Sequence, residues 1–171
     1  MQYAIVIFPP RKAQDLANSY RKRYDPQYSL IPPHIKLKTA FELGERKLED
    51  IIDHLEQVAA ATEPFQIDFH KVSTFHPTSN VIYFAIRDTD PIVRLHERCN
   101  KGILFDEEIY NYVPHLTIAQ EMSNDELNDV YGSLRMSKID ITVDIDRFHL
   151  LYQMENGMWT VYQTFLLRKA E

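Results

Sequence analysis

Two short stretches of the sequence repeat one arrangement of proline, histidine and apolar residues. They are Pro33–Leu37, which reads PHIKL, and Pro114–Ile118, which reads PHLTI, and they lie 81 residues apart. On a β-strand, residues two positions apart share a face, so each histidine should point the same way as the polar residue that follows it by two. That residue is Lys36 in the first copy and Thr117 in the second. Each copy therefore offers one imidazole and one polar companion from a rigid element.

The two imidazoles, His34 and His115, could act as an acid and base pair at phosphorus. If the two strands face each other across a cleft, one neutral histidine can take the proton of an attacking hydroxyl or water. The other, protonated, can give a proton to the departing oxygen, and each step contributes roughly 10²–10⁴-fold. Imidazole suits both tasks because its unperturbed pKa is about 6.5. Thr117 can hold a phosphoryl oxygen by its hydroxyl and Lys36 by its charge, which predicts a displacement at phosphorus without a metal or other cofactor.

Three other interpretations of these histidines stay open. A single histidine after proline on a strand is most often structural, although two matched copies at corresponding points favour a function. The same cleft could hold a nucleotide or an RNA end without turnover, as a non-catalytic binding module, and the lysine in the first motif favours this alternative. The histidines could also be ligands in a metal-assisted hydrolase, but no Asp or Glu spacing around His34 or His115 indicates a metal site.

Hydrophobic periodicity predicts the elements that must position the two motifs. Alternating or short β-branched runs predict strands at residues 3–8, 34–41, 65–72, 80–87, 115–120, 139–154 and 158–167. Apolar residues at helical spacing predict helices that begin near residues 10, 45, 90 and 123. The order is βαβαβ, then βαβαβ, then a final strand, which indicates a doubled unit.

The doubled pattern predicts one bilobal domain over residues 1–171. No linker rich in Gly or Ser separates the halves, and with only four Gly in the chain a flexible hinge is not expected. The first repeat covers approximately residues 1–76 and the second 77–171, with room for the terminal strands to be exchanged between the lobes.

Charge and composition narrow the class of partner. The chain has 19 Lys plus Arg against 25 Asp plus Glu, a formal net charge of −6, which argues against a protein that coats long duplex DNA. A local basic site, built from Lys36, Lys38 and the basic first helix, would suit a small anion or an RNA end. Cys99 is the only cysteine, which fits a reducing cytoplasm. The N-terminal residues have the pattern of neither a signal peptide nor a membrane span.

The paired motifs resemble those of the two-histidine (2H) phosphoesterase superfamily, in particular its YjcG-type bacterial branch. That superfamily carries two copies of His-x-Thr/Ser-x with alternating hydrophobic residues, and the resemblance covers almost the whole chain. It implies an α/β (α+β) fold with two lobes, an antiparallel sheet in each, helices outside and both histidines in a central cleft. It also implies a phosphoric diester hydrolase that needs no metal and acts on a cyclic or linear phosphodiester of a small nucleotide or RNA end.

By this resemblance His34 would be the proton donor and His115 the proton acceptor, while the charge of Lys36 and the hydroxyl of Thr117 assign these two residues to substrate binding. The second motif fits the family pattern fully, whereas Lys36 stands in the first motif where Thr or Ser is expected. A lysine there keeps affinity for phosphate but should favour the neutral form of His34, which points His34 towards the role of base. The two orders of acid and base therefore stay open.

Overall fold

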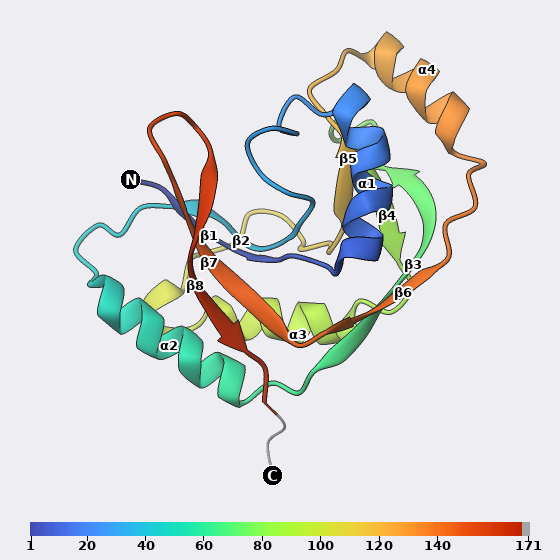
Figure 1. Ribbon diagram of the computed structural model, residues 1–171. Coiled ribbons are helices and arrows are strands. Elements are labelled where there is room, and N and C mark those ends of the chain that lie inside the picture. Colours follow the sequence, from blue (N-terminus) through green and yellow to red (C-terminus); the bar gives the residue numbers. More distant parts are fainter. Residues whose placement is uncertain (169–171) are drawn as a thin grey trace.

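The computed structural model describes residues 1–168 and shows helices packed against two antiparallel sheets (Figure 1). The strands are β1 (Tyr3–Ile7), β2 (Ile35–Phe41), β3 (Phe65–Thr74), β4 (Ile82–Ile86), β5 (Leu116–Ala119), β6 (Ile141–Ile145), β7 (Arg147–Gln153) and β8 (Trp159–Leu166). The helices are α1 (Arg11–Tyr24), α2 (Leu48–Ala60), α3 (Asp90–Cys99), α4 (Asn124–Leu134) and the short 3₁₀ helix η1 (Gly102–Leu104). Each predicted helix is present.

Both sheets have four strands and the same internal plan. The first sheet has the order β2-β1-β7-β8, the second has the order β5-β4-β3-β6, and every neighbouring pair in both sheets is antiparallel. The two strands that follow the histidines, β2 and β5, therefore occupy equivalent edges of the two sheets. The expected α+β fold with paired antiparallel sheets is confirmed.

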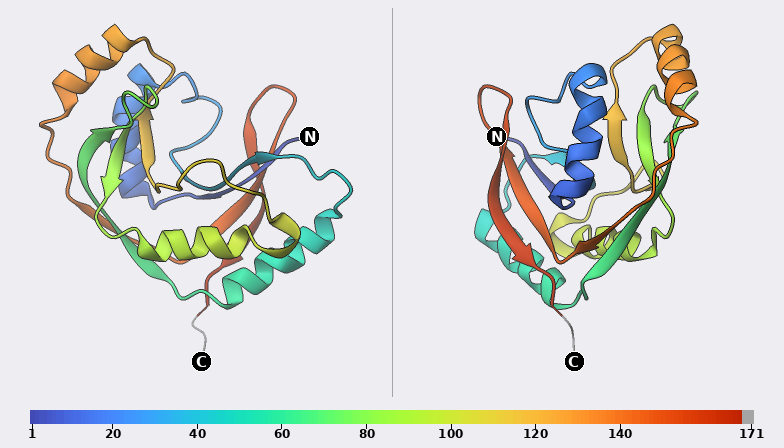
Figure 2. Two further views of the ribbon diagram at one scale, coloured as in Figure 1. Left: turned by 180° about the vertical axis from the view of Figure 1, so that it is seen from behind. Right: turned by 45° about the vertical axis from the view of Figure 1, so that its right-hand side comes forward.

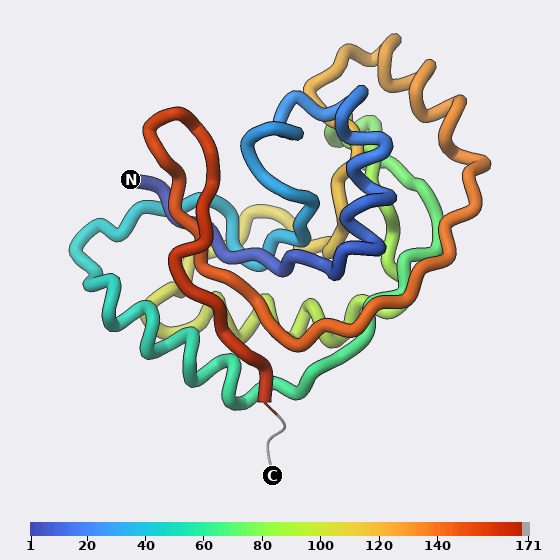
Figure 3. The backbone as a smooth tube through the Cα atoms, in the orientation of Figure 1, coloured from blue at the N-terminus to red at the C-terminus, as the bar shows by residue number. Residues whose placement is uncertain are grey.

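The predicted single strand at 139–154 is instead two strands that belong to different sheets. β6 pairs with β3 in the second sheet, and β7 pairs with β1 and β8 in the first. The pairing changes at Asp146, and the chain runs on as one long ribbon between the sheets (Figure 3). A period-two pattern reports the alternation of side chains along a strand but not the partner of that strand, so the crossing left no signal in the sequence.

Helices α1 and α3 each pack on the sheet other than the one that holds the strand before them. α1 follows β1 of the first sheet but packs on β5 of the second, whereas α3 follows β4 of the second sheet and packs on β2 of the first. Figure 2 shows α2 and α3 lying together on one side of the molecule, away from α4. The proposed division into repeats at residues 76 and 77 stays a prediction, because each sheet draws strands from both sides of it.

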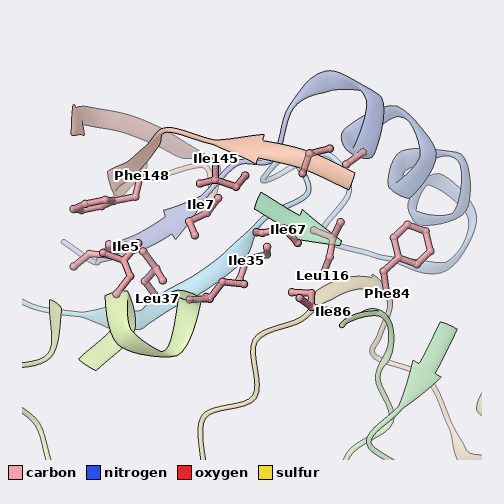
Figure 4. Close-up of a cluster of buried hydrophobic side chains, with 14 of the residues drawn as sticks. Ile5, Ile7, Ile35, Leu37, Ile67, Phe84, Ile86, Leu116, Ile145 and Phe148 are labelled. Carbon is pink, nitrogen blue, oxygen red and sulfur yellow. The ribbon is translucent and has the colours of Figure 1, made fainter. Parts of the chain in front are cut away.

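One buried core joins the two sheets. Ile35 and Leu37 of β2 lie in the same hydrophobic cluster as Leu116 and Ile118 of β5, and all four are fully buried. The close-up in Figure 4 shows Ile35, Leu37 and Leu116 among the other core side chains. Because alternate residues of a strand point to opposite faces, this core fixes the direction of the polar residues between them, Lys36 and Thr117.

No helix within residues 1–168 combines the length and the apolar character that a membrane crossing needs.

Candidate active site

The two histidines have the same local setting. His34 and His115 each lie one residue before an edge strand, and each Nδ1 is bonded to the main-chain carbonyl two residues earlier, His34 to Pro32 at 2.9 Å and His115 to Val113 at 2.8 Å. A carbonyl oxygen only accepts, so Nδ1 carries the hydrogen in both rings. This assigns the neutral tautomer and leaves Nε2 of each ring as the atom that can take or give a proton.

One cavity of about 310 Å³ brings three of the four predicted residues together. Its walls include His34, Lys36 and Thr117, so it touches the edge strands of both sheets. His115 does not line this cavity. It lies beside it against two aromatic rings, with ring centroids 4.8 Å from Phe75 and 5.2 Å from Tyr83.

Both imidazoles are held towards the neutral form. Burial lowers the pKa of His34 to about 4, and the positive charges of Lys36 and Arg21 act in the same direction. Burial also lowers the pKa of His115, and the charge of Lys36 again contributes. One ammonium group, that of Lys36, thus acts on both rings. The expectation that Lys36 favours neutral His34 agrees with this arrangement.

Lys36 and Lys38 have different surroundings, which corrects one expectation about the cleft. The side chain of Lys36 is exposed and makes no ion pair within residues 1–168. Lys38 is only 6% exposed, and its ammonium bonds Asp106 at 2.7 Å, Asn100 and the carbonyl of Leu104. The pairing of β1 with β2 shifts between these two lysines, and this bulge turns Lys38 away from the face of Lys36. The positive potential that Lys38 was expected to add is therefore neutralised.

The first helix, α1, also adds less positive charge to the cavity than its sequence indicates, because one of its arginines is paired with a carboxylate. Arg21 is 2% exposed, its Nε bonds the carboxylate of Asp25 at 3.0 Å, and it also donates to the carbonyl of Ile31 at 2.7 Å. Asp25 accepts a further hydrogen bond, from Gln120 beyond β5, at 2.9 Å. This network ties α1 to the second sheet and forms one wall of the cavity. The i, i+4 spacing of Arg21 and Asp25 was the signal that could have revealed it.

Tyr112 is a second residue that the sequence did not single out. Its hydroxyl donates to the main-chain carbonyl of Lys36, and its ring stacks on His96 with centroids 3.7 Å apart. His96 in turn bonds the carbonyl of Leu37 at 2.7 Å and the carboxylate of Glu108. The segment that leads into the second histidine is thereby fixed to the strand of the first. These contacts join residues far apart in the chain, so no local pattern indicates them.

Within residues 1–168, no three His, Cys, Asp or Glu side chains come together as a metal site requires. The metal-assisted alternative therefore gains no support from the arrangement of side chains, and it is left to a chelation experiment.

A comparison with known protein families identifies the family of this chain. The model of a family described as the 2'-5' RNA ligase superfamily matches residues 8–157. The chain belongs to this superfamily. The expected membership of the two-histidine phosphoesterases, which the twin motifs indicated, is confirmed.

Relatives match along their whole length. A protein of Geobacillus sp. (strain WCH70) is 50% identical over 171 residues, which covers 100% of this chain and 99% of the relative. A protein of Bacillus licheniformis is 48% identical over 167 residues, which covers 98% of this chain and 99% of the relative. The names of both carry the word phosphoesterase.

Solved structures share the fold at low sequence identity. A protein of Thermus thermophilus aligns with a TM-score of 0.69 at 20% identity, over 100% of both chains. Escherichia coli LigT in complex with 3'-AMP aligns with a TM-score of 0.67 at 14% identity, over 98% of both chains. At these identities the likeness establishes the fold only.

Proposed function

We propose that the protein hydrolyses a cyclic or linear phosphodiester of a small nucleotide or RNA end, with His34 and His115 as an acid and base pair. The observation that carries this proposal is the matched setting of the two rings, each with Nδ1 bonded to the carbonyl two residues before it and Nε2 left for chemistry. A purely structural role does not require the same tautomer at two matched positions, one of which, His34, lines a cavity together with Lys36 and Thr117.

The proposed reaction is an in-line displacement by water at phosphorus. One imidazole accepts the proton of the attacking water at Nε2, the bond from phosphorus to the departing oxygen breaks, and the other imidazole gives that oxygen a proton. The ammonium of Lys36 and the hydroxyl of Thr117 stabilise the negative charge that collects on the phosphoryl oxygens. No metal or other cofactor enters the reaction.

The low pKa of His34 favours the order in which His34 is the base and His115 the acid. Burial and the ammonium of Lys36 hold His34 neutral, and the bound phosphate must raise the pKa of whichever ring acts as acid. The family resemblance implies the opposite order, with His34 as donor and His115 as acceptor. The first order is the one that we propose, because the neutral form of His34 is a base without further change.

The names and complexes of similar proteins support the substrate class. Relatives about half identical to this chain carry phosphoesterase in their names. Escherichia coli LigT, of the same fold, has been solved with 3'-AMP, with phosphate, with ATP and with NADP+. A fold that accepts phosphate and nucleotides suits the size and charge of the cavity described above.

A binding module without turnover is the second candidate. It is favoured by Lys36 in place of the family's Thr or Ser, and by the lowered pKa of both histidines, since a general acid must be protonated and both rings are shifted towards the neutral form. Such a module would hold the same ligands and release them unchanged.

The test is turnover of 2',3'-cyclic nucleotides by the wild type, His34→Ala and His115→Ala, each with and without a chelator. Loss of at least about two orders of magnitude in both variants, with the fold retained, supports the proposal. His76→Ala is the matched control, since His76 is exposed and lies outside the cavity. Variants that match the wild type would overturn the catalytic proposal. Binding without turnover would favour the module, and loss of activity on chelation would favour a metal.

A further inference from the structure

A small apolar cluster lies on the face of the first sheet that carries Lys36. Val6, Ile31 and Leu151 are its buried members, and Phe8 and Trp159 pack against it. Val6 pairs with Lys36 across the strands, and their side chains therefore share a face. The neighbours of Val6 in the strand belong to the main core instead, so this cluster lies on the opposite side of the sheet.

Trp159 lines the same cavity as the residues proposed for phosphate chemistry. The walls of the cavity include His34, Lys36 and Thr117 together with Val6, Ile31 and Trp159. β2, which carries Lys36, and β7, which carries Leu151 of the cluster that Trp159 packs against, are separated by β1 alone, a distance of about 10 Å. The cavity is therefore lined both by charged and polar side chains and by an aromatic, apolar cluster that reaches across β1 to β8.

The main chain at Trp159 is tied to the loop between α1 and β2. The β7–β8 hairpin stands beside this loop (Figure 1), and the amide of Trp159 donates to the carbonyl of Leu30 at 2.9 Å. Gly157 at the turn has a φ of +89°, a conformation that side chains rarely adopt, and a Cβ there would lie 3.7 Å from Leu30. The hairpin thus presents Trp159 from a fixed position.

We propose that Trp159 is the wall on which a nucleobase stacks while the phosphodiester lies between Lys36 and Thr117. This inference rests on the proposed function and narrows its substrate class to nucleoside phosphodiesters, as opposed to sugar or glycerol phosphodiesters without a base. An indole offers a flat π-face on which any base can stack, whereas a sugar phosphate without a base has no aromatic ring to stack on it. Trp159 lies beyond residues 8–157, which the family model matches, so the match itself assigns it no role.

The first experiment measures binding in the unaltered protein. Trp159 is the only tryptophan of the chain, so tryptophan emission, excited selectively over that of the ten tyrosines, reports on this wall alone. We expect 3'-AMP to change the emission in a saturable way, and ribose 3-phosphate and inorganic phosphate to leave it nearly unchanged. Equal responses to 3'-AMP and to ribose 3-phosphate, or binding of 3'-AMP by calorimetry without any change in emission, would overturn the stacking role.

The second experiment compares 2',3'-cyclic AMP with a 1-deoxyribose 2,3-cyclic phosphate that has no base. Trp159→Leu should raise KM for the nucleotide by about tenfold or more, with kcat little changed and both constants for the base-free substrate unaltered. Trp159→Phe, which keeps an aromatic face, should restore most of the loss. Tyr162→Leu is the matched control, because Tyr162 is an exposed aromatic residue of the same strand outside the cavity.

The two proposals fail in different ways. If the wild type cleaves neither substrate, the hydrolytic function fails, while the fluorescence titration still decides whether a base stacks on Trp159. If the wild type cleaves both substrates with the same KM and Trp159→Leu changes neither, hydrolysis stands and the base-binding wall is wrong. A Trp159→Leu protein that does not fold is replaced by Trp159→Phe and the titration.

Discussion

The hydroxyl of Tyr112 donates a hydrogen bond to the main-chain carbonyl of Lys36. Tyr112 lies three residues before His115, and Lys36 lies two residues after His34, so this bond joins the segments that carry the two histidines. Burial raises the pKa of Tyr112, which keeps the hydroxyl protonated as a donor. The relative position of the two motifs therefore depends on a side chain outside both of them.

We expect Tyr112→Phe to weaken catalysis while the protein stays folded. The change removes one donor and keeps the ring that stacks on His96, so the free energy of unfolding should fall by about 1 kcal/mol. kcat/KM should fall by about tenfold, because a misplacement of catalytic groups is costly. Denaturant unfolding and steady-state kinetics measure the two effects. Tyr110→Phe, at a residue 80% exposed, is the control, and equal behaviour of the two variants would refute the positioning role of Tyr112.

The pH profile of the wild type should have its maximum on the acidic side of about pH 6.5. A base must be neutral, so activity should fall as the pH drops through the pKa of His34, about 4. An acid must be protonated, so activity should fall as the pH rises through the pKa of His115, which burial holds below its usual 6.5. Measurement of kcat/KM across this range tests the assignment, and a maximum above about pH 7.5 would contradict it.

Replacement of Lys36 by threonine should move both limbs of that profile to higher pH. The ammonium lowers the pKa of both His34 and His115, so its removal lets both rise. KM should also increase, since a charge that binds phosphate is lost. Lys36→Arg keeps the charge and serves as the comparison. A threonine variant whose profile does not move would show that Lys36 does not tune the histidines.

A substrate whose leaving group needs no proton can show which histidine is the acid and which the base. A 4-nitrophenyl phosphodiester needs no proton on its departing oxygen, so the variant that lacks the acid should recover most of its loss on this substrate. We expect His115→Ala to recover and His34→Ala to stay inactive. Recovery of His34→Ala instead would support the order that the family resemblance implies, with His34 as proton donor.

The buried pair of Arg21 and Asp25 should contribute strongly to the stability of the fold. Arg21→Met leaves the Asp25 carboxylate buried without its partner, so the free energy of unfolding should fall by about 3–5 kcal/mol. Lys22→Met, one residue on and exposed, should change it by less than about 0.5 kcal/mol. Denaturant titration of both variants makes the comparison, and similar midpoints would show that the pair contributes little.

The helices, most of the strands and the residue types of the site could be predicted from the sequence. Period-two and helical patterns are local, and the copies at His34 and His115 indicated which residue types are doubled. The family followed from the same motifs. These properties depend on residues close together in the chain, and the backbone of such a short segment can adopt only a few conformations.

The pairing of the strands and the set of side chains that face the cavity depend on tertiary contacts. The segment 139–154 forms two strands that part at Asp146, because its first part pairs with β3 and its second with β1. A bulge beside Leu37 turns Lys38 away from the face of Lys36. Trp159 reaches the cavity because its strand joins the first sheet from the far end of the chain. Each of these outcomes is a contact between segments distant in sequence, and it is set by the burial of the shared core rather than by any local preference.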